Sequence, residues 1–291
     1  MSSSNDQEVV AALTEKLGAS PRKCVYDQDG YLLTLNLSAF RLSQLPPEVW
    51  SFTRLQKLIL AGNPFGTLPA EIGKLTDLYV LVLNRCNIKQ LPAEIGALRK
   101  LKLLWLDFNQ LSALPAVFEQ FTVLRELTLY SNQFQVFPRT ILDCRNLELL
   151  DLAANQLKEI PPGIQRLNLL KRLNLHQNQL HDLPAEFRHL VALQGLCLGK
   201  NALKCVPPTL FELSHLQDLK LEENGLEVLP SEIGQLHDLR TLCLSGNTLC
   251  TLPDEVSQLP HLTELDIRGN PFNAHVPAIE ALNHLEVLKV S

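Results

Sequence analysis

The sequence predicts an α/β solenoid, in which short parallel strands stack into one sheet and short turns carry the chain back between strands. Three observations predict this fold class. Leucine returns every 23 residues without insertion or deletion, apolar and variable residues alternate after it, and a proline-containing segment closes each unit. The regular units open at Leu55, Leu78, Leu101, Leu124, Leu147, Leu170, Leu193, Leu216, Leu239 and Leu262.

Each unit follows the pattern LxxLxLxxNxLxxLPxxIxxLxx, and the unit that begins at Leu170 is a clean copy. Leucines at alternate positions share one face of an extended segment, so each unit contributes one short strand to the core. The proline fixes φ and starts a tight turn, and the return of six or seven residues is too short for a long helix. We therefore expect twelve stacked strands opposite short 3₁₀ turns.

The asparagine of the pattern has its own physical reason. Backbone groups lose their ladder partners where the chain bends after each strand, and a buried amide offers both donors and an acceptor to them. Cys86 replaces this asparagine in one unit and Phe40 replaces it in the first. The predicted asparagine ladder consists of Asn63, Asn109, Asn132, Asn155, Asn178, Asn201, Asn224, Asn247 and Asn270.

With these residues laid out, the chain resembles the leucine-rich-repeat family over residues 32–291, as eleven units of 23 residues plus a partial unit from Leu285. The resemblance implies a horseshoe with a parallel β-sheet on the concave face and short 3₁₀ or helical turns on the convex face. The LPxEIGxL form at 69–75, 92–98 and 230–236 is similar to Ras-group intracellular proteins of this family, and to bacterial cytosolic or effector members.

Residues 1–31 are expected to form an N-terminal cap. Asn5 and Asp6 can cap a helix that carries Val10 and Leu13, and the turn signal at 27–30 predicts a β-hairpin, with a partly disordered N-terminus as the alternative. At the other end, a strand that begins at Leu285 has no return segment after it. We expect that this edge either supports self-association, or belongs to a longer protein, or is tolerated.

Composition excludes several classes of function. The net charge of −5 gives no bulk attraction to nucleic acid or to an anionic membrane. No run of 18 apolar residues is present, and the N-terminus lacks the basic and apolar regions of a secretory signal. The seven cysteines are odd in number and scattered, which predicts reduced thiols and a cytoplasmic location.

No residue pattern predicts catalysis, a metal site or a cofactor. The chain has no phosphate-binding loop and no dinucleotide fingerprint, and its eight histidines are scattered along the repeats. His176 has no evident serine and aspartate partners for a triad. Cys197 and Cys243 lie two units apart, about 10 Å by strand spacing, which is too far for a disulfide.

The strand positions that carry no leucine are expected to face a partner on the concave side. Exposed aromatic residues with arginine match the composition of binding hot spots, although aromatic rings can also simply pack across neighbouring strands. In the C-terminal half the same positions are polar and alternate in sign, so they either pair with one another or orient a partner. The predicted protein-binding residues are Ile59, Tyr79, Val82, Arg85, Leu103, Trp105, Phe108, Arg125, Tyr130, Asp151, Arg172 and His176.

We therefore expect a non-catalytic protein–protein interaction module, an intracellular signalling adaptor or scaffold. The family resemblance implies a small GTPase or a signalling phosphatase as its protein partner. The alternative is the recognition domain of a larger multidomain enzyme or effector, such as a kinase, GTPase or ubiquitin ligase, with sequence beyond Ser291. An engineered consensus array would also give an unbroken period, but its designers avoid exposed thiols.

Overall fold

The computed structural model of the chain describes residues 5–272 and 285–290. They form two compact units. Unit 1 holds the residues up to 134 together with 140–147, and unit 2 holds 135–139 together with the residues from 148 onward. The strand order follows the chain order, with β1 to β6 in unit 1 and β7 to β13 in unit 2.

Unit 1 begins with helix α1 and a hairpin and continues with parallel strands. Strand β1 is antiparallel to β2, and every later pair in this unit is parallel and offset by one repeat, as in Leu58 opposite Leu81. The elements are α1 (Asp6–Leu17), β1 (Lys23–Tyr26), β2 (Leu32–Asn36), β3 (Lys57–Ile59), β4 (Val80–Val82), β5 (Leu103–Trp105) and β6 (Glu126–Thr128).

Unit 2 consists of parallel strands in the same register, so that Leu173 lies opposite Leu196 and Leu219 opposite Leu242. The predicted strand near the end of the sequence is present and pairs with its predecessor. The strands are β7 (Leu149–Asp151), β8 (Arg172–Asn174), β9 (Gly195–Cys197), β10 (Asp218–Lys220), β11 (Thr241–Cys243), β12 (Glu264–Asp266) and β13 (Val287–Lys289).

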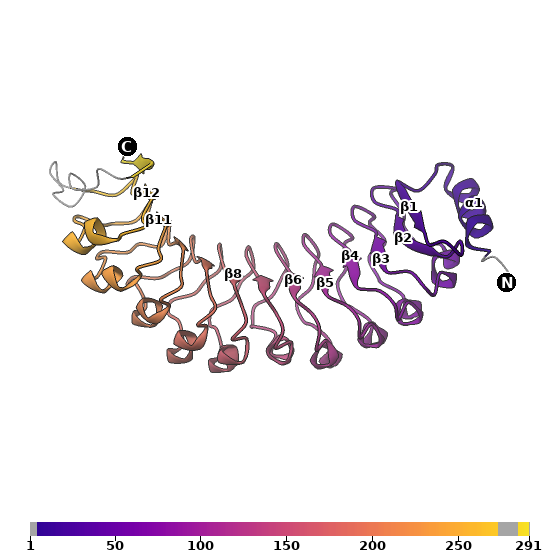
Figure 1. Cartoon of the computed structure of the whole chain (residues 1–291), viewed down its shortest axis with the longest axis horizontal. Coiled ribbons are helices and arrows are strands. Elements are labelled where there is room, and N and C mark those ends of the chain that lie inside the picture. The colour runs from indigo at the N-terminus through magenta and orange to yellow at the C-terminus, as the bar shows by residue number, and fades with distance from the viewer. Residues whose placement is uncertain (1–4, 273–284, 291) are drawn as a thin grey trace. The chain divides into compact units, whose positions relative to one another are not determined.

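Short 3₁₀ helices return the chain after strands β2 to β11, as the proline positions predict. Pro69, for example, has φ −72° and ψ 156° and stands directly before η2. In each unit these helices lie on one side of the core and the strands on the other (Figure 1). Among the described residues they are η1 (Pro47–Ser51), η2 (Ala70–Lys74), η3 (Ala93–Ala97), η4 (Ala116–Gln120), η5 (Arg139–Asp143), η6 (Pro162–Arg166), η7 (Ala185–His189), η8 (Pro208–Glu212), η9 (Ser231–Gln235) and η10 (Asp254–Gln258).

The repeated apolar residues form the core between these two walls. Leu78, Leu81 and Leu83 of one repeat are fully buried on the strand side, and Ile72 and Ile95 are fully buried on the helix side. Each such side chain contributes roughly 1.5–3 kcal/mol through burial, before conformational entropy is subtracted. The predicted fold class, an α/β leucine-rich-repeat solenoid with a parallel sheet and 3₁₀ turns, is confirmed.

The asparagine ladder is present with the predicted chemistry. The Asn109 side-chain oxygen accepts hydrogen bonds from the backbone N–H groups of Cys86 (3.1 Å) and Ile88 (2.9 Å). Its amide donates to the carbonyls of Leu83 (2.9 Å) and Leu106 (2.8 Å). One buried side chain thus satisfies backbone groups of two successive repeats.

The N-terminal helix and hairpin lie beside β2 in unit 1. Val10 and Leu13 of α1 are buried, and Gly18 ends the helix in the left-handed conformation with φ 68°. Asn5 makes no capping hydrogen bond from its side chain, whereas the Asp6 carboxylate accepts a hydrogen bond of 2.7 Å from the N–H of Leu32. This bond joins the helix to the first repeat, and the assignment of residues 1–31 as a separate cap stays a proposal.

Candidate protein-binding face

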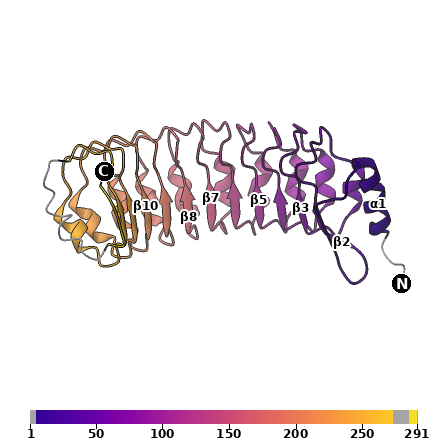
Figure 2. The ribbon, with the colours of Figure 1, turned by 90° about the horizontal axis from the view of Figure 1, so that it is seen from above.

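The open face of each unit is the face of its sheet that points away from the 3₁₀ helices. Because side chains alternate along a strand, the first and third residues of each three-residue strand point to this face. In β5, Leu104 is fully buried in the core, while Leu103 and Trp105 on the open face are half-buried. Figure 2 shows neighbouring strands of one unit side by side, so residues at equal positions form rows across them.

A left-handed residue follows each of the strands β2 to β12, three positions after the last residue of the strand. Arg85 has φ 58° and Phe108 has φ 55°, and both still donate their backbone N–H to the next repeat. This position therefore extends the hydrogen-bond ladder while the chain turns. The same conformation occurs at Ala39, Gly62, Arg85, Phe108, Ser131, Ala154, Gln177, Lys200, Glu223, Gly246 and Gly269.

Three side chains in unit 1 stack at this edge, and we call Arg85, Phe108 and Tyr130 the aromatic edge. The Arg85 guanidinium carbon lies 3.9 Å from the centroid of the Phe108 ring. The Phe108 and Tyr130 ring centroids are 5.0 Å apart at an interplanar angle of 77°, an edge-to-face contact. Phe108 remains 39% exposed, so the stack presents apolar area to solvent.

A central row of the open face lies next to the aromatic edge. Val82, Trp105 and Thr128 stand opposite one another on β4, β5 and β6. Val82 is buried, whereas Ile59, further along the same row, is half-buried. The indole Nε1 of Trp105 and the hydroxyl of Thr128 are buried without a hydrogen-bond partner. Buried polar groups of this kind each cost about 1–3 kcal/mol.

Tyr79 and Arg125 lie at the opposite ends of the strands from the aromatic edge. Tyr79 immediately precedes β4 and Arg125 immediately precedes β6, whereas Phe108 and Tyr130 follow their strands. Tyr79 is 39% exposed. It lines a shallow hollow of about 490 Å³ that also includes Lys102 and Val123. The residues that the sequence grouped as one patch thus form a central row with two separate edges.

The predicted site residues of unit 2 have different environments. The Asp151 carboxylate accepts hydrogen bonds from the N–H of Ala153 (2.9 Å) and from Asn174 Nδ2 (3.0 Å), and burial raises its pKa. His176 Nδ1 lies 3.2 Å from Glu222 Oε1. Arg172 is exposed on β8. Asp151 is thus held by neighbours, whereas Arg172 is available to a ligand.

The same face of unit 2 is hollowed, and its rim carries paired charges. The hollow has a volume of about 570 Å³ and includes the small residues Gly195, Cys197 and Cys243. In the repeat of β12, Arg268 Nη2 lies 2.6 Å from Asp266 Oδ2, and the hydrogen bonds from this arginine lower the pKa of the Asp266 carboxyl. The predicted pairing of charges between neighbouring strands occurs between Lys289 on β13 and Glu264 on β12, whose Nζ and Oε1 atoms lie 2.8 Å apart.

The described residues show neither a disulfide nor a cluster of metal-binding side chains. All seven cysteines are free, and burial raises the pKa of Cys243 to about 11, which keeps it a protonated and weak nucleophile. Over residues 5–272 and 285–290, no three histidine, cysteine, aspartate or glutamate side chains gather where they could hold a metal ion. Over the same residues, no helix is both long and apolar enough to pass through a bilayer.

Two features of the open face were not singled out from the sequence. Thr128 stands beside Trp105 with its hydroxyl buried, and Gly195 leaves a gap between Arg172 and Asp218. The gap at Gly195 could have been found from the sequence, because the 23-residue period places Arg172, Gly195 and Asp218 in one row. The buried hydroxyl of Thr128 could not have been found in this way, since a threonine on a strand is ordinary.

Comparison with known families agrees with the repeat. A family model described as "Leucine-rich repeat region" matches residues 47–137 and 205–291, and a second, "Leucine rich repeat", matches 145–203. The chain belongs to the leucine-rich-repeat family. The repeat fold of this family generally mediates protein–protein interaction, and its repeat arrays are generally non-catalytic binding modules.

Solved structures give the same fold. A leucine-rich-repeat protein of Leptospira interrogans is 37% identical with a TM-score of 0.74, and the match covers 89% of this chain and 71% of that one. The plant peptide hormone receptor RGFR1 in complex with RGF2 is 26% identical with a TM-score of 0.72, covering 92% of this chain and 51% of the receptor.

A third solved structure supports the fold alone. The Drosophila Toll–Spätzle complex is 24% identical with a TM-score of 0.73, and the match covers 89% of this chain and 37% of that one. A comparison with curated proteins gave no match. The chain thus spans 71% of the Leptospira protein and about half of the plant receptor.

Proposed function

We propose that this chain is a non-catalytic protein-binding module whose partner docks on the open face of unit 1, centred on the aromatic edge and Trp105. The observation that carries the proposal is the stack of Arg85, Phe108 and Tyr130, which exposes aromatic area beside arginine. Tryptophan, tyrosine and arginine are the residues that most often dominate binding energy at interfaces. Further proposed contacts on this face of unit 1 are Ile59, Tyr79, Val82, Leu103 and Arg125. In unit 2, Asp151, Arg172 and His176 are proposed as protein contacts of that unit's own open face.

The backbone at Phe108 supports a use for its side chain. A left-handed conformation costs a residue with a Cβ roughly 1–2 kcal/mol. The exposed stack returns only about 0.5–1 kcal/mol from its cation–π contact and a similar amount from the edge-to-face contact. Phe108 therefore contributes little net stability, while Gly62 occupies the same repeat position without that cost. Binding supplies a reason for a large side chain here.

We further propose an intracellular signalling adaptor or scaffold that works in the cytoplasm, with a small GTPase or a signalling phosphatase as its partner. Seven free cysteines, two of them exposed, support a reducing compartment. The partner class rests on the LPxEIGxL repeats at 69–75, 92–98 and 230–236. The receptor RGFR1, which this chain resembles, was solved in complex with RGF2, and this supports a protein as the ligand.

The second candidate function is recognition within a larger protein that also carries an enzyme domain, such as a kinase, a GTPase or a ubiquitin ligase. The observation that favours it is the length of the receptor relative, of which this chain covers 51%. The open face would then choose the substrate or the regulator of that enzyme. Sequencing of the transcript beyond the codon for Ser291 decides between the two candidates.

The experiment that tests the binding face replaces Phe108 by glycine. Phe108→Gly removes the ring and suits the backbone, so the fold is retained. Gln177→Gly is the matched control, because Gln177 has the same φ of 55° at the same repeat position and is exposed. Proteins captured by cross-linking to the wild-type chain are quantified by mass spectrometry for each variant.

The expected result is at least a tenfold loss of the captured partner with Phe108→Gly and no change with Gln177→Gly. A tenfold loss corresponds to about 1.4 kcal/mol, which is within the range of hot-spot residues. Undiminished capture by Phe108→Gly, with Arg85→Ala and Tyr130→Ala equally without effect, would place the partner elsewhere. Binding assays with purified GTPases and phosphatase subunits test the partner class separately.

A further inference from the structure

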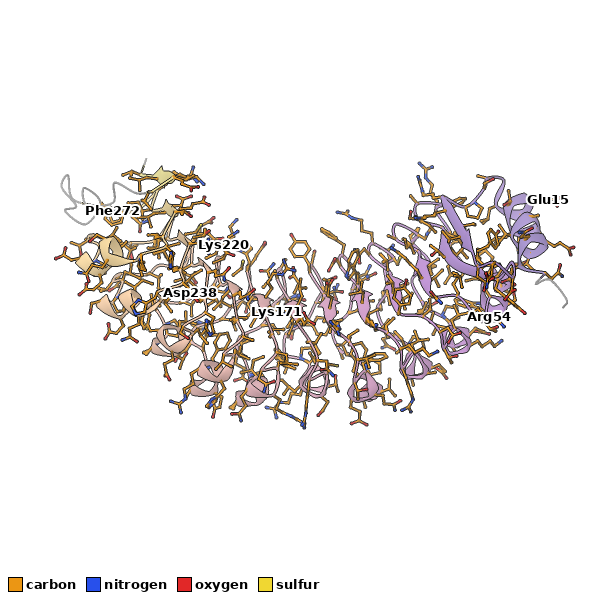
Figure 3. All side chains as sticks on the ribbon, in the orientation of Figure 1. Glu15, Arg54, Lys171, Lys220, Asp238 and Phe272 are labelled. Atoms are coloured by element: carbon orange, nitrogen blue, oxygen red, sulfur yellow. The ribbon has the colours of Figure 1, made fainter. Side chains whose placement is uncertain are left out.

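Three charged side chains in the hollow of unit 2 have no hydrogen-bond or ion-pair partner among the described residues. Arg172, Asp218 and Lys220 are exposed, and within residues 5–272 and 285–290 their side chains make no hydrogen bond or ion pair. Figure 3 labels Lys220 among the side chains of the open face. At the rim, by contrast, Lys289 Nζ lies 2.8 Å from Glu264 Oε1. The centre of the hollow thus holds unused charge of both signs.

Small side chains create the space between these charges. Gly195 stands in register with Arg172 on one side and with Asp218 on the other. A Cβ at Gly195 would meet Arg172 Cγ at 3.5 Å, an ordinary contact, and the φ of this glycine is not positive. The gap is therefore a matter of side-chain size, since the backbone at this position accepts any residue. Cys197 and Thr241 continue the floor.

The spacing of the charges selects a ligand geometry. Arg172 and Asp218 are two strands apart, about 9.6 Å at the usual strand separation. In a polyproline II helix, residues three apart are separated by about 9.3 Å and lie on the same side. In an extended β peptide, side chains on one side are separated by about 6.6 Å or about 13 Å. The polyproline II repeat matches the row, and the β repeat does not.

We propose that this hollow binds a polyproline II segment of a partner protein, with an acidic side chain against Arg172 and a basic side chain three residues away against Asp218. Such a segment crosses the strands at Gly195, which has no side chain of its own and lies beside the stem of Arg172. Its carbonyl groups have no internal hydrogen bonds. Lys220, in the second row beside Cys197, donates to them. The proposal rests on the proposed function only in that the ligand is a protein segment.

The test uses synthetic peptides, so it does not depend on the unidentified partner or on the aromatic edge. A fluorescent proline-rich peptide with the core Glu-Pro-Pro-Lys is titrated with the purified chain at about 50 mM salt, where exposed charges are weakly screened. Comparison peptides carry Glu-Pro-Lys, which breaks the spacing, and Gln-Pro-Pro-Gln, which removes the charges. We expect the first peptide to bind at least fivefold more tightly than the other two.

Protein variants assign the contacts. Arg172→Gln should weaken binding of Glu-Pro-Pro-Lys at least fivefold but leave the binding of Gln-Pro-Pro-Lys unaffected. In the same way, Asp218→Asn should weaken binding only of peptides that carry the lysine. Gly195→Leu fills the gap and should reduce binding at least tenfold with an unchanged unfolding midpoint. Lys158→Ala, at an exposed position without a side-chain partner, is the control and should bind as wild type does.

Two outcomes would overturn the proposal. One is the absence of binding to Glu-Pro-Pro-Lys at about 1 mM protein, and the other is binding that changes with neither peptide spacing nor Gly195→Leu. Either result leaves the Phe108→Gly experiment in unit 1 untouched. Conversely, an inactive aromatic edge would not alter the peptide titrations in unit 2.

Discussion

Replacement of Asn109 by alanine tests how much the asparagine ladder contributes to the stability of the repeats. Asn109 is 7% exposed, and its side chain bonds to five backbone groups. Of these, the carbonyl of Asp107 also accepts a hydrogen bond of 2.9 Å from the N–H of Arg85. The carbonyl of Leu106 keeps a second hydrogen bond of 3.0 Å from Asn132 Nδ2. The N–H groups of Cys86 and Ile88 and the carbonyl of Leu83 lose the bonds that Asn109 supplies to them.

The size of the effect follows from these three groups. An unsatisfied buried backbone group costs about 1–3 kcal/mol, so Asn109→Ala should lower the free energy of unfolding of this region by about 4 kcal/mol. A loss of that size is exceptional for one substitution. Because each repeat contacts mainly its neighbours, the loss should be greatest in the two repeats that Asn109 joins.

Two measurements check this prediction. Urea unfolding followed by circular dichroism gives the stability, and hydrogen exchange with mass spectrometry locates the loss, which should include the amides of Cys86 and Ile88. Asn168→Ala is the control, because Asn168 is exposed and makes no side-chain hydrogen bond, and it should change stability by less than about 0.5 kcal/mol. A loss below about 1 kcal/mol for Asn109→Ala, with both amides still protected, would refute the ladder as a source of stability.

Three further predictions concern the titration of Asp151, the titration of Asp266 and the reactivity of the cysteine thiols. Burial raises the pKa of Asp151 above its unfolded value, so its contribution to stability falls as pH rises above about 4, and Asp151→Asn should gain stability over wild type toward pH 7. Arg268 lowers the pKa of Asp266, so that stability is present above about pH 4 and lost below it, and Asp266→Asn should show a deficit that grows as pH rises to about 4. Urea unfolding between pH 3 and 7 measures both, and differences independent of pH would contradict them. Ellman's reagent should modify the exposed Cys205 and Cys250 rapidly in the folded chain. Cys144 should react only after unfolding, because burial raises its pKa to about 12. Equal rates for all three thiols would contradict the burial of Cys144.

Most of the fold could be predicted from the sequence because each repeat restates it. The period of 23 residues sets the register directly, as in Leu58 opposite Leu81. The proline before each return fixes a local φ, so the 3₁₀ turn follows from residues only a few positions apart. Local and global preferences therefore agree throughout the repeats, which is the condition under which sequence reasoning succeeds.

The candidate site could be predicted only in part, since the repeat fixes positions and leaves contacts open. The pattern places Trp105 on the open face but carries no information that its indole N–H lacks a partner. Tyr79 and Phe108 were grouped because both are aromatic and near in sequence, yet one precedes its strand and the other follows it. The alternation of charge predicted pairs, but Gly195 separates Arg172 from Asp218.

The left-handed position after each strand also has an evolutionary consequence. A mutation to glycine at that position relaxes the backbone, so selection for stability favours glycine there, as at Gly62, Gly246 and Gly269. Other repeats keep a side chain at that position, as at Phe108 and Gln177, and the exposed Phe108 ring adds apolar area to the open face. Among descendants of this array, the repeats that have lost that side chain should mark where a partner's footprint has receded. This one position per repeat would then record the history of the interface.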